Sequence, residues 1–197
     1  FQEQIRSYVS GGGPSDSLRS LCANDDYFTD ADANVYALPT FIGNHDRGRF
    51  GHFLDEDNGV LPDDAKVART RLAHALMYFA RGVPVIYYGD EQGFVGDGDD
   101  KDARQDMFPS LVPSYNDDDL MGTDATTADA NFDPTHPLYA SFSEYAALYQ
   151  AHQALRTGAQ QHRFSQDSAG IYAFSRIDRD EQIEYILAFN NADGAQG

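Results

Sequence analysis

Short apolar runs flank a longer amphipathic segment in the middle of the chain. The first run, LPTFIG at 38–43, is short and bounded, which predicts a strand buried on both faces. Residues 62–81 space their apolar positions as one face of a helix does, with Pro62 at the first helical position and Gly82 just past the end. A second run, VPVIYYG at 83–89, follows directly and is rich in β-branched and aromatic residues. Strand, helix and strand predict a βαβ unit with two parallel strands in one sheet.

Two short helices are predicted near the start of the chain, at 2–9 and 15–23. The stretch SGGGPS separates them, because three glycines and a proline break regular structure. Residues 24–37 are polar and predict a loop. Residues 89–134 form a second polar segment that is too long for an ordinary connection, which indicates a functional or substrate-facing loop.

A different kind of unit follows at the end of the chain. Residues 137–156 predict an amphipathic helix that stops at Gly158. Beyond it, GIYAFSR at 170–176 and IEYILAFN at 183–190 are joined by the turn-like DRDEQ and predict two antiparallel strands. We therefore expect a domain boundary near Gly158.

The composition is globular and strongly acidic. With 41% hydrophobic residues, 197 residues can fill one core or one core and part of a second. Lys and Arg total 14 against 32 Asp and Glu, and this net charge of −18 argues against binding to nucleic-acid phosphates or anionic membranes. Lysine occurs only at Lys66 and Lys101. This balance can accompany high-salt or secreted life, so we expect an extracellular location; a solvated acidic surface without a specific role is the alternative.

Few features point to a metal or redox site. Cys22 is the only cysteine, which excludes an internal disulfide and predicts a small buried apolar side chain. No apolar run approaches the roughly 20 residues needed to span a bilayer. The Asp-rich stretch at 96–102 lacks the glycine and glutamate of an EF-hand loop, which leaves only weak calcium binding open. Because residue 1 is Phe rather than Met, we expect the chain to be a piece of a longer protein.

Polar side chains follow both predicted strands at the point where each strand ends. Asn-His-Asp at 44–46 follows the first, and Asp-Glu-Gln at 90–92 follows the second. In parallel α/β folds ligands bind outside the carboxyl ends of the strands, so both groups are predicted to point into one mouth. The alternative is a structural role, with Asp46 paired to Arg47 or Arg49 and Asp90 capping a turn.

The motif FIGNHD, followed some 35 residues later by GVPVIYYGDEQG, resembles the α-amylase family of glycoside hydrolases. In that family the first motif closes the seventh strand of a (β/α)8 TIM barrel and the second forms the eighth. The later DKDARQDMF resembles the polar loop after the eighth strand. The resemblance implies an α/β fold, with the C-terminal portion of a barrel at 1–157 and the start of an antiparallel β-sandwich at 158–197.

The resemblance also implies a chemistry for the motif residues. Hydrolysis of an α-glucosidic bond with retention needs a carboxylate nucleophile and a carboxylic acid roughly 5–5.5 Å apart, around an oxocarbenium-like sugar. Asp46 corresponds to a third carboxylate that stabilises this charge, and His45 to a donor to a sugar hydroxyl. Asn44 is expected to support the loop beside the substrate. Asp100 and Arg104 are expected to bind hydroxyls of a neighbouring glucose unit. Either tyrosine of the YY pair at 87–88 is a candidate stacking surface, with a core role as the stronger alternative.

The chain departs from the family pattern in one consequential way. The segments that carry the nucleophile Asp and the acid/base Glu of the family are not found, and they would precede residue 1. We therefore expect α-1,4-glucan hydrolysis by a full-length protein and no activity from this chain alone. A transglycosylase, an α-1,6 hydrolase, an α-glucosidase or a non-catalytic carbohydrate-binding module are the alternatives.

The expected partners follow from the same interpretation. They are an α-glucan or oligosaccharide and the remainder of the barrel, without nucleic acid or membrane. Two strands with open edges also predict that the chain oligomerises or is covered by a partner. No organic cofactor is implied, and calcium, if bound, is expected mainly outside this chain.

Overall fold

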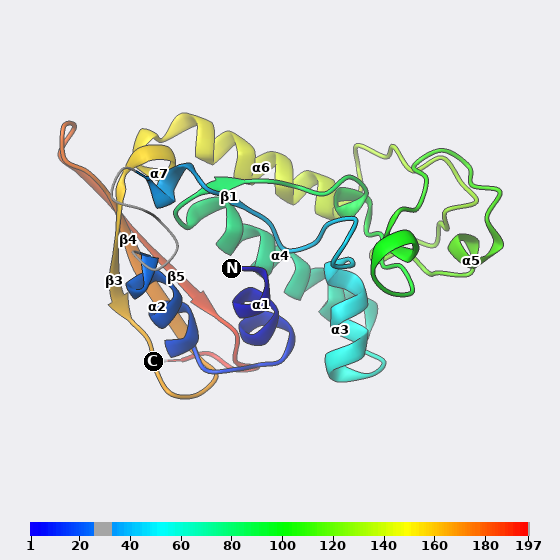
Figure 1. Cartoon of the computed structure of the whole chain (residues 1–197), viewed down its shortest axis with the longest axis horizontal. Coiled ribbons are helices and arrows are strands. Elements are labelled where there is room, and N and C mark those ends of the chain that lie inside the picture. The colour runs from blue at the N-terminus through cyan, green and yellow to red at the C-terminus, as the bar shows by residue number, and fades with distance from the viewer. Residues whose placement is uncertain (26–32, 197) are drawn as a thin grey trace.

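The computed structural model describes residues 1–25 and 33–196. Helix α4 (Asp63–Phe79) runs through the middle, α6 (Pro137–Ala151) lies along it, and a three-stranded sheet closes one end (Figure 1). The polar segment 89–134 lies at the opposite end (Figure 1). The other helices are α1 (Gln2–Ile5), continued by a π-helical turn at Arg6–Ser10, α2 (Asp16–Ala23), α3 (Phe50–Asn58), α5 (Pro113–Asn116) and α7 (Gln153–Thr157).

The predicted βαβ unit is present. Strands β1 (Pro39–Thr40) and β2 (Val83–Pro84) pair in parallel, with Pro39 opposite Val83. Both strands are much shorter than predicted, and Val83 and Val85 are 46% and 43% exposed. The expectation of strands buried on both faces is therefore wrong for this chain. Within the described residues β1 and β2 have only each other as strand neighbours.

Helix α4 forms close to its predicted bounds of 62–81. Asp63 and Asp64 occupy its first turn, where carboxylates offset the positive end of the helix dipole. Its buried side packs on α6 through aromatic rings, with the Tyr78 and Phe79 centroids 5.9 Å and 5.7 Å from that of Tyr145. This packing places the strand ends at 40 and 84 on a rigid support. No helix in the described ranges is long and apolar enough to cross a membrane.

The predicted helix at 137–156 divides into α6 and α7. His152 takes an extended conformation between them, and the His152 ring is hydrogen-bonded at 2.8 Å to the Tyr185 hydroxyl of the sheet. The chain turns at this point toward the sheet instead of continuing along α4.

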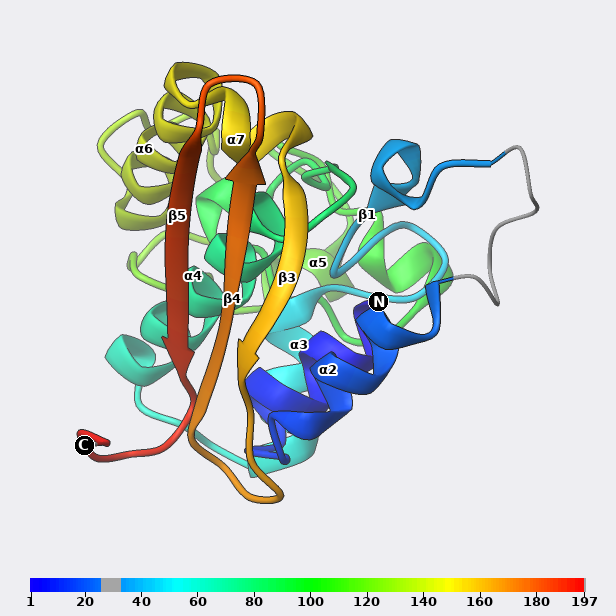
Figure 2. The ribbon, with the colours of Figure 1, turned by 90° about the vertical axis from the view of Figure 1, so that its left-hand side faces the viewer.

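The C-terminal sheet has the order β3 (Ala159–Phe164), β4 (Ile171–Asp178), β5 (Ile183–Asn190), all antiparallel. The pairing of β4 with β5 confirms the predicted hairpin, whereas β3 was not predicted because AQQHRF is polar and mostly exposed. Helices α4 and α6 lie behind the sheet in Figure 2, and α2 lies beside the edge of β3. The Tyr8 hydroxyl donates to the Gly170 and Phe189 carbonyl oxygens at 2.8 Å and 2.7 Å.

One helix was not predicted, and two expectations are not tested. Helix α3 was not predicted, because its nine residues bury only Phe50, Gly51, Phe53 and Leu54, with His52 between them and three acidic residues after them. Residues 26–32 of the predicted loop lie outside the described residues. The division into 1–157 and 158–197 stays a prediction, although α7 ends at Thr157 and β3 begins at Ala159.

Candidate active site

Asp46 lies in a tight loop that follows β1. The Asn44 backbone N–H donates to the Gly48 carbonyl at 3.1 Å and closes the loop. The Asn44 side-chain oxygen accepts from the backbone N–H groups of Asp46 at 2.9 Å and Arg47 at 2.8 Å. Gly48 has φ +87°, a conformation that glycine adopts without a Cβ penalty. Asn44 thus orders the loop from within and leaves the Asp46 side chain directed outward, 64% exposed.

The structure brings the residues from the two motifs together. Arg104 Nη2 lies 3.5 Å from Asp46 Oδ1, and Arg104 Nε donates to the His45 carbonyl at 3.3 Å. Arg104 also pairs with Asp100 one turn earlier. His45 Nε2 lies 3.3 Å from Asp46 Oδ2. Two carboxylates, a guanidinium and an imidazole therefore form one exposed cluster, in which the hydrogen-bonding groups can exchange their partners for polar groups of a ligand.

Tyrosines hold the loop of Asp100 and Arg104 in this place. The Tyr87 hydroxyl donates to the Ala103 carbonyl at 3.0 Å, and the Tyr115 hydroxyl donates to the Lys101 carbonyl at 2.7 Å. Burial raises the pKa of Tyr87 well above its usual value, so this hydroxyl stays a donor. Tyr88 is more exposed, and its ring lies 4.6 Å from the Tyr87 ring, edge to face. The stacking role of either ring stays a prediction.

The prediction that the residues after β1 and after β2 point into one mouth is wrong for two of the three residues after β2. Asp90 and Gln92 are 4% and 3% exposed, because they bind protein groups rather than facing solvent. Asp90 Oδ1 accepts from Arg49 at 3.1 Å, and the Gln92 amide bonds the Asp133 backbone N–H and carbonyl at 2.9 Å and 3.1 Å. Glu91 is half-buried and accepts from the Gly89 N–H at 2.9 Å, and burial raises the pKa of the Glu91 carboxyl.

The pairings expected in the structural alternative for Asp46 do not form among the described residues. Arg47 pairs with Glu3 at 2.6 Å, and Arg49 pairs with Asp90. The basic side chains beside Asp46 are its neighbour His45 and Arg104, which comes from a different loop. Arg49 is the residue that the sequence did not mark as part of the site, because its partners lie about 40 to 56 positions along the chain.

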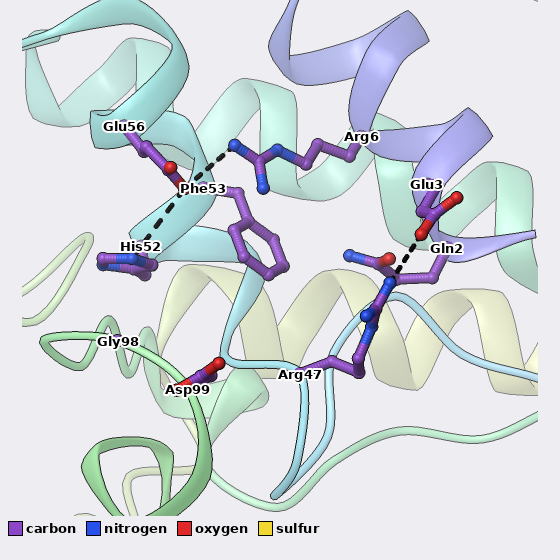
Figure 3. A pocket seen from close by; sticks show the side chains of 9 residues that line it. All are labelled: Gln2, Glu3, Arg6, Arg47, His52, Phe53, Glu56, Gly98 and Asp99. Atoms are coloured by element: carbon purple, nitrogen blue, oxygen red, sulfur yellow. Dashed lines mark hydrogen bonds and ion pairs between the residues drawn. The ribbon is translucent and has the colours of Figure 1, made fainter.

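A cleft of about 420 Å³ opens beside the loop of Asp46, and Figure 3 shows the side chains that line the cleft. The Arg6 guanidinium lies 4.3 Å from the centroid of the Phe53 ring and pairs with Glu56 at 2.9 Å, which covers the apolar wall. The cleft shares Arg47 with the loop of Asp46, but the candidate site residues do not line it. Its lining residues are Gln2, Glu3, Arg6, Arg47, His52, Phe53, Glu56, Gly98 and Asp99.

Comparison with known proteins shows the family to which the chain belongs. Residues 19–175 match the family model described as alpha amylase, catalytic domain. The chain belongs to the α-amylase family. An α-amylase of Streptomyces lividans is 50% identical over 192 residues, which are 98% of this chain and 21% of that protein. A β/α-amylase of Paenibacillus polymyxa is 29% identical over 93% of this chain and 13% of its own length.

Solved structures of α-amylase-family enzymes share the fold. An Anoxybacillus α-amylase superposes with a TM-score of 0.71 at 22% identity, over 97% of this chain and 34% of that one. The cyclomaltodextrin glucanotransferase CldA superposes with a TM-score of 0.68 at 24% identity, over 96% of this chain and 31% of that one. The predicted fold class is confirmed: the α-amylase-family chain forms part of a (β/α)8 barrel followed by an antiparallel sheet. It spans about a fifth of the length of the Streptomyces relative.

Three carboxylates in the polar segment approach one another. Oxygens of Asp97, Asp117 and Asp118 lie within 4.8 Å of each other. Burial, and then the nearby Asp97, raise the pKa of Asp118 to about 6. Gln105 donates to Asp118 at 3.5 Å. Exposed acidic groups commonly approach one another without an ion, so we assign no metal there.

Proposed function

We propose that the longer protein containing this chain is a retaining α-glucan hydrolase that cleaves α-1,4-glucosidic bonds in starch or maltooligosaccharides. The observation that carries the proposal is the exposed cluster of Asp46, His45, Arg104 and Asp100 outside the carboxyl end of a parallel strand. Family membership and the α-amylase relative support the same substrate class.

Each residue of the cluster has a role in this proposal. Asp46 carries the negative charge that stabilises the oxocarbenium-like sugar, because a fixed carboxylate beside a developing positive charge lowers its energy. His45 donates to a hydroxyl of the same ring. Asp100 and Arg104 bind the next glucose unit, and Asn44 keeps the loop in shape. The nucleophile and the acid/base group are supplied by a part of the protein outside this chain.

Replacing Asp46 tests the proposal directly. In the full-length protein, D46N removes the charge and keeps the shape, so turnover on starch should fall by about 10²–10³-fold, the usual cost of one electrostatic stabilising group. Circular dichroism should show an unchanged fold. D124N, which neutralises an exposed aspartate of the polar segment, is the matched control and should keep wild-type turnover. Equal turnover of D46N and wild type would contradict the role.

A transglycosylase is a second candidate. Two cyclomaltodextrin glucanotransferases, from Niallia circulans and Bacillus sp. 6.6.3, are each 33% identical over 45% of this chain. Product analysis on starch, pullulan and sucrose distinguishes the two: linear maltooligosaccharides support hydrolysis, and cyclic or transferred products support transglycosylation.

The proposed partner of this chain is the remainder of the barrel. Leu38, Val83 and Val85 are 39–46% exposed beside the two-stranded sheet, which is where further barrel strands would pack. An extracellular location remains a proposal, supported by the acidic, lysine-poor composition.

A further inference from the structure

Arg49 lies directly behind the loop of Asp46. It precedes α3, and the loop that it ends is closed by the bond between Asn44 and Gly48. The Arg49 side chain is completely buried. A buried guanidinium is costly unless its hydrogen bonds are made. Nε and Nη1 of Arg49 have partners, whereas the buried Nη2 has none among the described residues, so the partners of Nε and Nη1 indicate why the side chain is there.

Those partners come from two other segments of the candidate site. Arg49 Nη1 donates to the Tyr88 carbonyl at 2.8 Å and to Asp90 at 3.1 Å, both at the end of the β2 segment. Arg49 Nε donates to the Gln105 side chain at 2.6 Å, next to Arg104. The guanidinium also lies against three aromatic rings at 4.5–5.2 Å, those of Tyr87, Tyr88 and Phe94.

The exposed contacts of Asp46 cannot fix its position alone. Its pair with Arg104 is 3.5 Å long, and the two side chains are 64% and 47% exposed. Exposed ion pairs of this kind contribute little to stability, whereas a buried, planar guanidinium with several partners holds its neighbours in one geometry. The three segments that carry Asp46, Tyr87 and Arg104 are all bound to Arg49.

We propose that Arg49 is a positioning residue for Asp46: it joins the loop of Asp46, the end of the β2 segment and the loop of Arg104 in the geometry that the reaction needs. This inference rests on the proposed function. Lysine cannot take the place of Arg49, because an ammonium group lacks the planar fork that reaches Tyr88, Asp90 and Gln105 together.

The test is a double-mutant cycle of R49K and D46N in the full-length protein. R49K alone should lower kcat on starch by about 10–10²-fold, as expected when a reacting group shifts by about 1 Å. In the D46N background R49K should cost less than about threefold, because the group that it positions is already neutral. Equal penalties in both backgrounds, or an unchanged kcat in R49K, would overturn the proposal.

R176K is the matched control, because it also replaces a buried arginine with lysine. Arg176 is also completely buried, but it donates to carbonyl oxygens of Phe79 and Gly158, next to the C-terminal sheet. R176K should lower the melting temperature and keep kcat within about twofold, since its partners are remote from Asp46. An equal loss of kcat in R176K would show that R49K acts through general destabilisation and would contradict the proposal.

A structural measurement separates this proposal from the proposed function. Absence of glucan-cleaving activity in the wild type contradicts the function and leaves the geometry to be judged by crystal structures of wild type and R49K. Displacement of the Asp46 carboxylate away from Arg104 in R49K, with R176K unchanged, supports the positioning role. An unmoved Asp46 in R49K refutes it.

Discussion

At the scale of single residues, burial decides which acidic groups face a ligand. Asp46 and Asp90 both follow predicted strands, yet Asp46 is exposed and Asp90 is enclosed by Arg49 and His74, whose Nε2 lies 3.6 Å away. The sequence shows two acids at two strand ends and does not show which of them meets a buried cation. The motif pointed to the cluster around Asp46 through the resemblance, whereas the role of Arg49 depends on contacts across the fold.

Asp118 offers a pH-dependent test at this scale. Burial raises the pKa of its carboxyl from 3.8 to about 6 in the folded protein, so the folded state binds the proton more tightly than the unfolded state. Asp118 therefore favours folding at acidic pH, and this contribution is lost as pH rises from about 4 through about 6.

D118N should consequently be more stable than wild type at pH 8 and nearly equal at pH 3.5. Since Asp118 is only half-buried, we expect a gain of about 1 kcal/mol after solvent screening. Calorimetric melting of the full-length protein in EDTA measures it, because EDTA removes any cation that would offset the repulsion. D119N, at the exposed neighbour, should show no such pH-dependent gain. A D118N variant that loses stability at pH 8 would contradict the prediction.

At the scale of elements, local signals predicted those parts of the fold whose packing partners lie within the chain. Helix α4 and the β4–β5 hairpin form as predicted, because apolar spacing, end signals and turn residues agree there. Strands β1 and β2 are short, since their length depends on neighbouring strands that the described residues do not supply. Strand β3 was missed because its register comes from pairing with β4 rather than from an alternating pattern.

The open sheet predicts association of the isolated chain. Val85 is 43% exposed and directly follows β2, with its backbone N–H bonded to the Thr40 carbonyl at 2.8 Å. Among the described residues no strand pairs with the other side of β2, so Val85 lies next to an open strand edge. Purified residues 1–197 should show a mass that rises with concentration in light scattering after size exclusion.

A lysine at the edge should suppress this association, so V85K should shift the chain toward monomer. V60K is the control, because Val60 is 98% exposed after α3 and lies outside the sheet. A monomeric wild-type chain at all concentrations, or equal association of V85K and V60K, would rule out the sheet edge as the contact.

At the scale of the whole molecule, the net charge of the chain and the small number of candidate catalytic carboxylates agree with the proposed role as part of a glucan hydrolase. A net charge of −18 suits a neutral polyhydroxyl ligand better than a polyanion. The core is continuous from α1 to the C-terminal sheet, since Tyr8, Met77 and Phe174 belong to one cluster. Among the described residues the site contains one candidate carboxylate for the reaction, Asp46, whereas retaining hydrolysis needs a nucleophile and an acid beside it.

Residues 1–197 should therefore bind or position part of a glucan without cleaving it. Reducing-sugar release from starch by the purified chain should stay at the level of a buffer blank, while the full-length protein at equal molarity should release sugar. Circular dichroism must show helix and strand in the chain, so that inactivity is not unfolding. D46N in the chain is the control for contaminating amylase: an activity that survives in it comes from another protein. Hydrolysis by residues 1–197 that D46N abolishes would mean that this chain itself carries a complete catalytic site.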